Sequence, residues 1–186
     1  MPSQEGAPVP PAVELVRDFV NTREPQLAAD DLTTPGALRD WCAARGLVSA
    51  TTNLGAPDLH RALAVREGLR AVLLGHAGHE AEGGAVARLN QVFAELPVTA
   101  EFSVSGYRLV PAAAGPLAEI VAALGDAIRQ ASQDQTWQRL KVCARDTCRW
   151  AFYDASKNHS RRWCSMSGCG NHVKMKRAYV RRTQSG

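Results

Sequence analysis

The sequence predicts a mainly α-helical protein, in which a multihelical N-terminal domain with a small β-hairpin is followed by a small C-terminal finger. Apolar residues recur at helical spacing before residue 135, and four of the five cysteines lie in the last third of the chain. With 186 residues, 45% of them hydrophobic, the chain can form one domain of ordinary size plus a finger. We expect a disordered N-terminus (1–10), a helical domain (11–135) and a finger with a basic C-terminal helix (136–186).

The first helix is expected to begin at Pro11, because proline suits the first turn of a helix. The apolar residues that follow recur at helical spacing: Val13, Val16, Phe19 and Val20. Asn21 and Thr22 then end the helix, since both residue types compete for local backbone hydrogen bonds. The alternative is that Asn21 forms a polar corner of a ligand pocket.

The second helix is expected to begin with Thr34 as its N-cap and Pro35 at its first position, and to end at Gly46. Leu38, Trp41 and Cys42 provide its apolar positions. Cys42 stands apart from the other cysteines, and we expect it to be a small buried apolar side chain rather than a nucleophile.

A third, longer helix is expected from Pro57, and its apolar residues recur at mostly helical spacing: Leu59, Leu63, Leu69 and Leu73. Arg66 and Arg70 lie close to this apolar stripe, so each needs a partner. Pairing with Glu67 and other nearby carboxylates is the default expectation.

The remainder of the helical domain alternates connections with regular structure. Gly75–Gly84 is glycine-rich and is expected to be a flexible connection, too mobile for its histidines to hold a metal ion. The elements expected after it are a helix over Ala85–Leu96, a hairpin formed by Thr99–Ser105 and Tyr107–Val110, and a helix from Pro116 to about Ser132.

The four remaining cysteines form two pairs with the same spacing. Four residues separate Cys143 from Cys148, fifteen follow, and four separate Cys164 from Cys169. This spacing predicts one structural zinc ion in a closed tetrahedral shell of thiolates. Disulfide bridges or free redox thiols are the alternative. No basic and apolar signal-peptide pattern follows Met1, so we expect a reducing cytoplasm, where paired cysteines more often bind metal.

The residues around the cysteines predict the finger's fold. Arg149–Asp154 is aromatic and favours a strand, and Asp154–Asn158 has turn composition, which together indicate a short hairpin between the cysteine pairs. A helix is expected over Asn171–Arg182, where neither proline nor glycine interrupts the chain. A knuckle, a hairpin, a second knuckle and a helix make a treble-clef-like four-cysteine zinc finger.

These residues resemble a known family. The segments Arg139–Cys143, Trp150–Asp154, Ser160–Met166 and Cys169–His172 are similar to the CGNR zinc finger, and the FVNT sequence ending at Thr22 is typical of the helical ABATE domain that precedes it. The resemblance implies a bacterial, stress-induced transcription regulator. It also implies a candidate site for an anionic small molecule between helices, formed by Asn21, Arg66 and Arg70. His172 stands where the family name calls for arginine.

The charge of the chain is divided unevenly. Residues 141–186 hold eleven Lys or Arg and two Asp or Glu, a net charge of +9, whereas residues 1–140 have a net charge of −5. This asymmetry is expected when one module meets phosphates. The predicted nucleic-acid contacts are Arg161, Arg162, Lys174, Lys176, Arg177, Arg181 and Arg182. Of these, Lys174, Arg177 and Arg181 lie on one face of the predicted helix.

No enzyme motif is present: the chain has no phosphate-binding glycine loop, dinucleotide fingerprint, His-Glu-x-x-His or nucleophile elbow. The sequence therefore predicts a non-enzymatic, zinc-dependent DNA-binding regulator without a membrane partner. Its helical domain would sense a small ligand or form a homodimer. Two alternatives stay open: a zinc-stabilised RNA- or protein-interaction module, and a ligand-binding helical domain with a purely structural finger.

Overall fold

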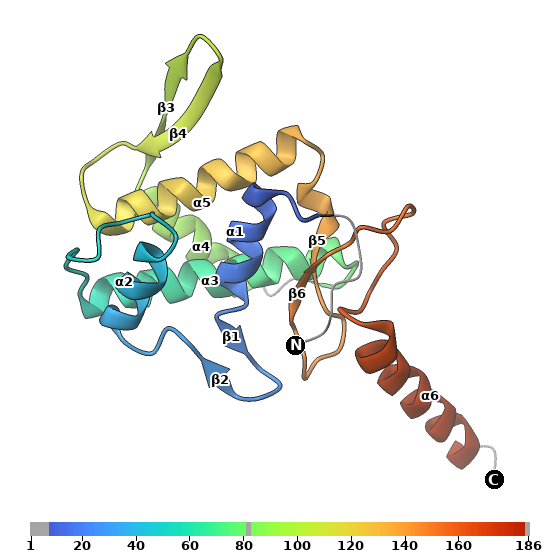
Figure 1. Cartoon of the computed structure of the whole chain (residues 1–186). Helices are drawn as coiled ribbons and strands as arrows, with labels where there is room; N and C mark the ends of the chain where they lie inside the picture. Colours follow the sequence, from blue (N-terminus) through green and yellow to red (C-terminus); the bar gives the residue numbers. More distant parts are fainter. Residues whose placement is uncertain (1–7, 81–82, 185–186) are drawn as a thin grey trace.

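The computed structural model of the chain describes residues 8–80 and 83–184 (Figure 1), with side chains described except at 177–179 and 181–184. Of the N-terminus predicted to be disordered, residues 1–7 lie outside the described part. The helices are α1 (Pro11–Val20), α2 (Pro35–Ala43), α3 (Ala56–His76), α4 (Gly83–Glu95), α5 (Pro116–Gln133) and α6 (Asn171–Gln184). The strands are β1 (Arg23–Glu24), β2 (Ala29–Asp30), β3 (Val98–Ser103), β4 (Gly106–Pro111), β5 (Leu140–Val142) and β6 (Ala151–Tyr153).

The predicted fold class is confirmed: the described chain is mainly α-helical, with small antiparallel hairpins and a four-cysteine finger at its C-terminal end. α1 begins at Pro11 as predicted and ends where Asn21 caps it. In α2 the Thr34 hydroxyl accepts a hydrogen bond from the Ala37 N–H at 3.1 Å, and Pro35 follows the cap. Sequence-local signals therefore set the starts of both helices.

The long helix α3 is the centre of the helical domain, with α1, α2, α4 and α5 packed around it (Figure 1). α4 crosses it closely at Gly68, where an added Cβ would lie 2.4 Å from the Leu89 Cβ. Only glycine fits this crossing without displacing a helix.

α3 ends later than predicted, because Gly75 and His76 are helical and not part of a flexible connection. The physical reason is a tertiary contact. His76 Nδ1 lies 2.9 Å from the Leu140 carbonyl oxygen, and the imidazole meets the Trp137 ring edge-on at 5.1 Å between centroids. α4 likewise starts at Gly83, two residues before the predicted start.

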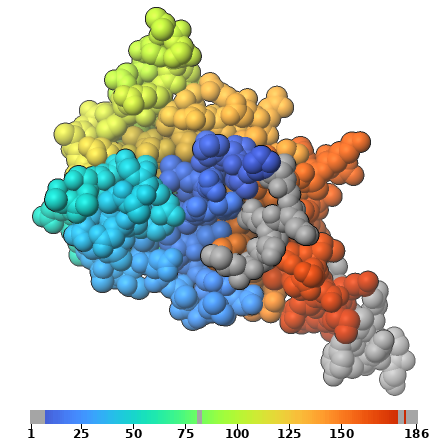
Figure 2. Space-filling view, in the orientation of Figure 1, coloured from blue at the N-terminus to red at the C-terminus, as the bar shows by residue number. Residues whose placement is uncertain are grey.

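β3 and β4 form a hairpin that projects from the rounded body (Figures 1 and 2). The sequence predicted this hairpin, and each end of its two strands lies within two residues of the predicted position. Phe102 and Tyr107 pair across its outer half, with ring centroids 5.7 Å apart, and Phe102 is 79% exposed. The base of the hairpin rests on α5.

The main hydrophobic core includes residues from both parts of the protein, and a second, small cluster around Phe152 and the cysteines lies within the finger. Leu140 and Val142 from β5, and Ala151 and Tyr153 from β6, are buried in the same cluster as the helices. β5 packs on α3 and β6 on α1 (Figure 1). The finger's hairpin is therefore part of the main core, while α6 extends away from the body.

The described helices lack the combination of length and apolar composition that a membrane-crossing segment requires.

Candidate metal centre and nucleic-acid interface

The first knuckle is the tight turn that carries Cys143 and Cys148. The Cys143 N–H donates to the Trp150 carbonyl oxygen at 2.9 Å, and the Cys148 N–H donates to that of Arg145 at 2.9 Å. Arg149 completes the turn with a φ of +51°, a left-handed conformation unusual for a residue other than glycine. This turn brings the Cys143 and Cys148 sulfurs into one cluster.

The second knuckle carries Cys164 and Cys169. Ser165 closes it: its hydroxyl accepts from the Gly168 N–H at 3.1 Å, and its carbonyl oxygen accepts from the Gly170 N–H at 2.9 Å. The π-helical turn Met166–Gly170 leads directly into α6. The start of α6 is thus fixed by a cysteine of the cluster.

The four sulfur atoms lie within 4.8 Å of one another. The Sγ of Cys164 is 3.8 Å from that of Cys148 and 3.8 Å from that of Cys169. A tetrahedron with zinc–sulfur bonds of about 2.3 Å has edges of about 3.8 Å. A disulfide would instead bring two sulfurs to about 2.05 Å. The geometry fits one zinc ion with four thiolate ligands.

Neighbouring thiols of the cluster shift one another's pKa values in opposite directions. Hydrogen bonds from Cys148 and Cys164 hold the pKa of the Cys143 thiol well below its ordinary value. Contacts with Cys143 raise the pKa values of the Cys148 and Cys164 thiols, so these two become thiolates only when they bind a cation. Arg145 Nη1 lies 3.9 Å from the Cys169 sulfur, where its charge offsets the negative charge of a four-thiolate site. Cys42 contrasts with these residues: burial in the helical core raises the pKa of its thiol to about 11, so it stays protonated.

A buried ion pair holds the loop between the knuckles. Lys141 Nζ donates to Asp154 Oδ2 at 2.8 Å and to the His159 carbonyl oxygen. Asp154 is fully buried and also accepts from the Ser156 hydroxyl at 2.6 Å and the Arg161 N–H at 2.9 Å. Burial raises the pKa of Asp154, but these donors outweigh it and hold the pKa below its usual value. The sequence indicated the turn but gave no sign that Lys141 is structural.

Asn21 and Arg70 join the helical domain to the finger. The Asn21 amide donates to the Ala151 carbonyl oxygen at 2.9 Å and accepts from the Ala151 N–H at 2.8 Å. Arg70 donates to the carbonyl oxygens of Arg149 at 2.7 Å and Val20 at 2.6 Å. Both contacts fasten the first knuckle and β6 to the end of α1 and the C-terminal half of α3.

Arg66 lies beside them and makes a bidentate pair with Asp30, with both nitrogen–oxygen distances 2.7 Å. Glu67 accepts from Arg66 at 2.9 Å and from Arg70 at 3.1 Å, as the default expectation had it. The structure thus brings Asn21, Arg66 and Arg70 together, with their polar groups bonded to the protein itself. The ligand site predicted for them stays a prediction.

The predicted nucleic-acid contacts whose side chains are described divide into two groups. Arg161 is half-buried, donates to the Cys164 carbonyl oxygen at 2.8 Å and lies over the Phe152 ring at 5.2 Å, so it supports the finger. Arg162, Lys174 and Lys176 are exposed. The side chains of Arg177, Arg181 and Arg182 lie outside the described part of the chain.

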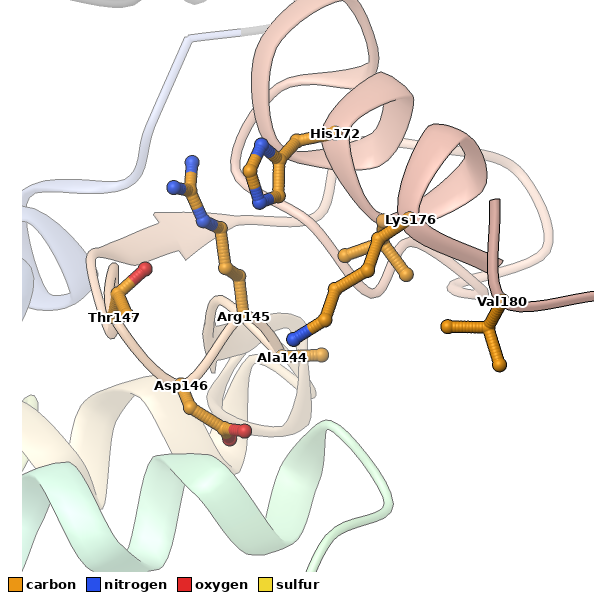
Figure 3. Close-up of a pocket in the computed structure, with 8 residues that line it drawn as sticks. Ala144, Arg145, Asp146, Thr147, His172, Lys176 and Val180 are labelled. Atoms are coloured by element: carbon orange, nitrogen blue, oxygen red, sulfur yellow. The ribbon is translucent and has the colours of Figure 1, made fainter. Parts of the chain in front are cut away.

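A groove separates the first knuckle from α6 (Figure 3), with a volume of about 570 Å³. The sequence did not indicate that Arg145 and His172 would share it, because the two residues meet only when the knuckles close on each other. Its lining residues are Ala144, Arg145, Asp146, Thr147, His172, Val173, Lys176 and Val180.

Comparison with protein families gives two matches. The ABATE model, described as "Putative stress-induced transcription regulator", matches residues 14–147, and the CGNR zinc finger model matches residues 139–182. No curated protein matches the chain. The matches confirm the predicted arrangement, and with the sulfur geometry they identify a single structural zinc site formed by Cys143, Cys148, Cys164 and Cys169.

Proposed function

Because the chain belongs to the ABATE family, we propose that it is a transcription regulator that binds duplex DNA through its zinc finger. The observation that carries the proposal is the position of α6. This helix starts at Asn171, immediately after the cysteine cluster, and extends from the body (Figure 1). Its Lys174 and Lys176 are exposed. Residues 141–186 hold the entire excess of positive charge. A fixed basic helix on a zinc module suits the phosphates of DNA.

Zinc acts here as a structural ion. Its free energy of binding becomes free energy of folding, on the order of 10 kcal/mol in small finger peptides. The ion ties the first knuckle to the second, and α6 takes its direction from the second. Without zinc the basic helix would lose its fixed attachment to the body, so DNA binding should require the metal.

The helical domain would control the finger through their shared contacts. A small ligand or a second copy of the chain that displaces α1 or α3 would also shift Asn21 and Arg70, which hold β6 and the first knuckle. Such coupling requires that the effector favour one of two arrangements of these helices. We propose ligand sensing or dimerisation as the role of this domain.

We propose no catalytic activity. Both matching families are of regulator and zinc-finger types, and four thiolates leave zinc no open position for a substrate. Because DNA is the proposed partner, we propose that the protein acts on the chromosome in the bacterial cytoplasm.

The proposal is tested by fluorescence anisotropy with the full-length protein and a labelled duplex of mixed sequence, titrated at several salt concentrations. For the zinc-loaded protein, the logarithm of the binding constant should fall linearly with the logarithm of the salt concentration. Chelation of zinc should abolish binding. The same titration with an RNA hairpin and with single-stranded DNA examines the alternative module. Preference for RNA, or no salt-dependent binding to duplex DNA, would overturn the proposal.

A further inference from the structure

The groove between the first knuckle and α6 has two walls that the metal site fixes. One wall is the loop 144–147, which lies between Cys143 and Cys148. The other is the first two turns of α6 and Val180, which follow Cys169. Because zinc ligands flank both walls, the width of the groove is set when the cluster forms.

The groove is positively charged. Arg145 and His172 lie at one end, and the Lys176 side chain reaches from α6 toward the loop (Figure 3). Asp146 is the one carboxylate among the lining residues, and its Oδ1 already accepts a hydrogen bond from Arg149 Nη2 at 2.7 Å. Among the side chains that the structure describes, none forms an ion pair with Lys176. Lys176 therefore faces the groove without a compensating carboxylate, whereas Arg145 shares its charge with the zinc site.

Both walls of the groove also carry apolar side chains: Ala144 on the loop, and Val173 and Val180 on α6. A free inorganic anion gains nothing from apolar walls, whereas the sugar carbons of a nucleic-acid strand can pack against them. The 2′-hydroxyl of ribose would lose hydrogen bonds there, which favours deoxyribose. Basic donors and apolar side chains along one groove match the alternating phosphates and sugars of a DNA strand.

We propose that this groove holds the phosphodiester backbone of one DNA strand, with Arg145, His172 and Lys176 as the phosphate contacts. The inference rests on the proposed DNA binding and specifies the surface that carries it. These contacts position the protein on the duplex and carry no base information of their own.

The assignment selects one face of α6. Lys174 and Lys176 are both exposed lysines of the same helix. Two residues in an α-helix are about 200° apart around the axis, so their side chains point in nearly opposite directions. Lys176 lines the groove and Lys174 does not. Lys174 belongs to the helix face that the sequence predicted to contact nucleic acid. The two lysines therefore form a matched pair that distinguishes the two faces.

The experiment measures duplex DNA affinity against salt concentration for the full-length, zinc-loaded wild type and the variants Lys176→Ala, Lys174→Ala, Arg145→Ala and Arg145→Lys. Lys176→Ala and Arg145→Ala should each reduce the log–log slope by about 0.9, since each removes one phosphate contact. Lys174→Ala and Arg145→Lys should keep the wild-type slope. Zinc content is measured for every variant, because Arg145 also contacts the Cys169 sulfur.

The outcomes separate the two proposals. If Lys174→Ala reduces the slope and Lys176→Ala does not, the groove assignment is wrong while DNA binding stands. If neither lysine variant changes a slope that the wild type does show, DNA meets another surface and the groove is again excluded. If the wild type binds duplex DNA without salt dependence, or does not bind it, the proposed function fails together with this inference. If Arg145→Ala loses zinc, its slope is not informative, and the comparison of Lys176→Ala with Lys174→Ala alone tests the groove assignment.

Discussion

The side chain of Asn21 and the backbone of Ala151 exchange two hydrogen bonds, although 130 residues separate them in the chain. The amide of Asn21 donates to the carbonyl oxygen and accepts from the N–H, as a neighbouring strand would. A residue at the end of α1 thus extends the pairing of β6 and anchors the finger to the helical domain.

Asn21→Ala should lower the free energy of unfolding of the zinc-loaded protein by about 1–3 kcal/mol, because two hydrogen bonds to backbone groups are lost. Denaturant unfolding with zinc in excess measures the change. Asn90→Ala is the matched control, since Asn90 is an exposed residue of α4 and its loss should change stability by less than about 0.5 kcal/mol. Equal stability of the two variants would show that the anchor contributes nothing.

Arg70→Met should lower the free energy of unfolding by more, about 3–5 kcal/mol. The substitution removes a buried guanidinium that donates hydrogen bonds to three carbonyl oxygens and to Glu67. Arg70→Lys should recover part of this loss at most, since an ammonium group cannot reproduce the planar fork. Arg108→Met removes an exposed arginine that pairs with Glu101 and should cost at most about 1 kcal/mol. Denaturant unfolding compares the three, and an Arg70→Lys variant as stable as the wild type would contradict the geometric argument.

Zinc removal should loosen the helical domain as well as the finger. Chelation is expected to speed amide hydrogen exchange in β5 and β6, and also in α1 and the C-terminal part of α3, which pack on those strands. The β3–β4 hairpin, which rests on α5, serves as an internal control whose exchange should stay unchanged. Faster exchange confined to residues 143–184 would mean that the shared core does not transmit the effect.

His76 should make stability depend on pH. Burial lowers the pKa of His76, despite the hydrogen bond to Leu140, so the unfolded chain takes up a proton at a higher pH than the folded chain. The stabilisation is therefore complete above about pH 6.5 and is lost as the pH falls below that value. His76→Gln should flatten this part of the unfolding profile measured with zinc in excess. His60→Gln, at an exposed position of the same helix, should leave it as in the wild type, and identical profiles for both variants would exclude His76 as the cause.

His172→Arg should strengthen DNA binding if the groove holds a phosphate. Arginine carries a fixed charge and would add one cationic contact, so the salt slope should increase by up to about 0.9. His60→Arg adds the same charge on α3, away from the groove, and should leave the slope unchanged. Equal increases for the two variants would indicate a non-specific effect of net charge.

Local signals in the sequence predicted most of the elements. Pro11 and Thr34 mark helix starts that the structure confirms, and the equal spacing of the cysteine pairs led to the zinc site. Such patterns can be read because the residues that interact lie within a few positions of each other.

Contacts between distant segments could not be predicted in the same way. β5 and β6 have three residues each, too few to show an alternating pattern, so their place in the main core was not apparent. The end of α3 depends on Leu140, and the partner of Asn21 lies 130 residues away. Arg145 became a candidate contact only when the knuckles placed it beside His172.

Chromosomal occupancy tests the central claim most directly. The tagged wild-type protein and the Cys164→Ser variant are mapped across the genome at matched protein levels, because Cys164 is a zinc ligand and lies outside the helical core. A zinc-dependent DNA-binding regulator should be enriched at discrete sites, and the variant should lose that enrichment. A wild type with no enrichment above background, or a variant that occupies the same sites, would contradict the account.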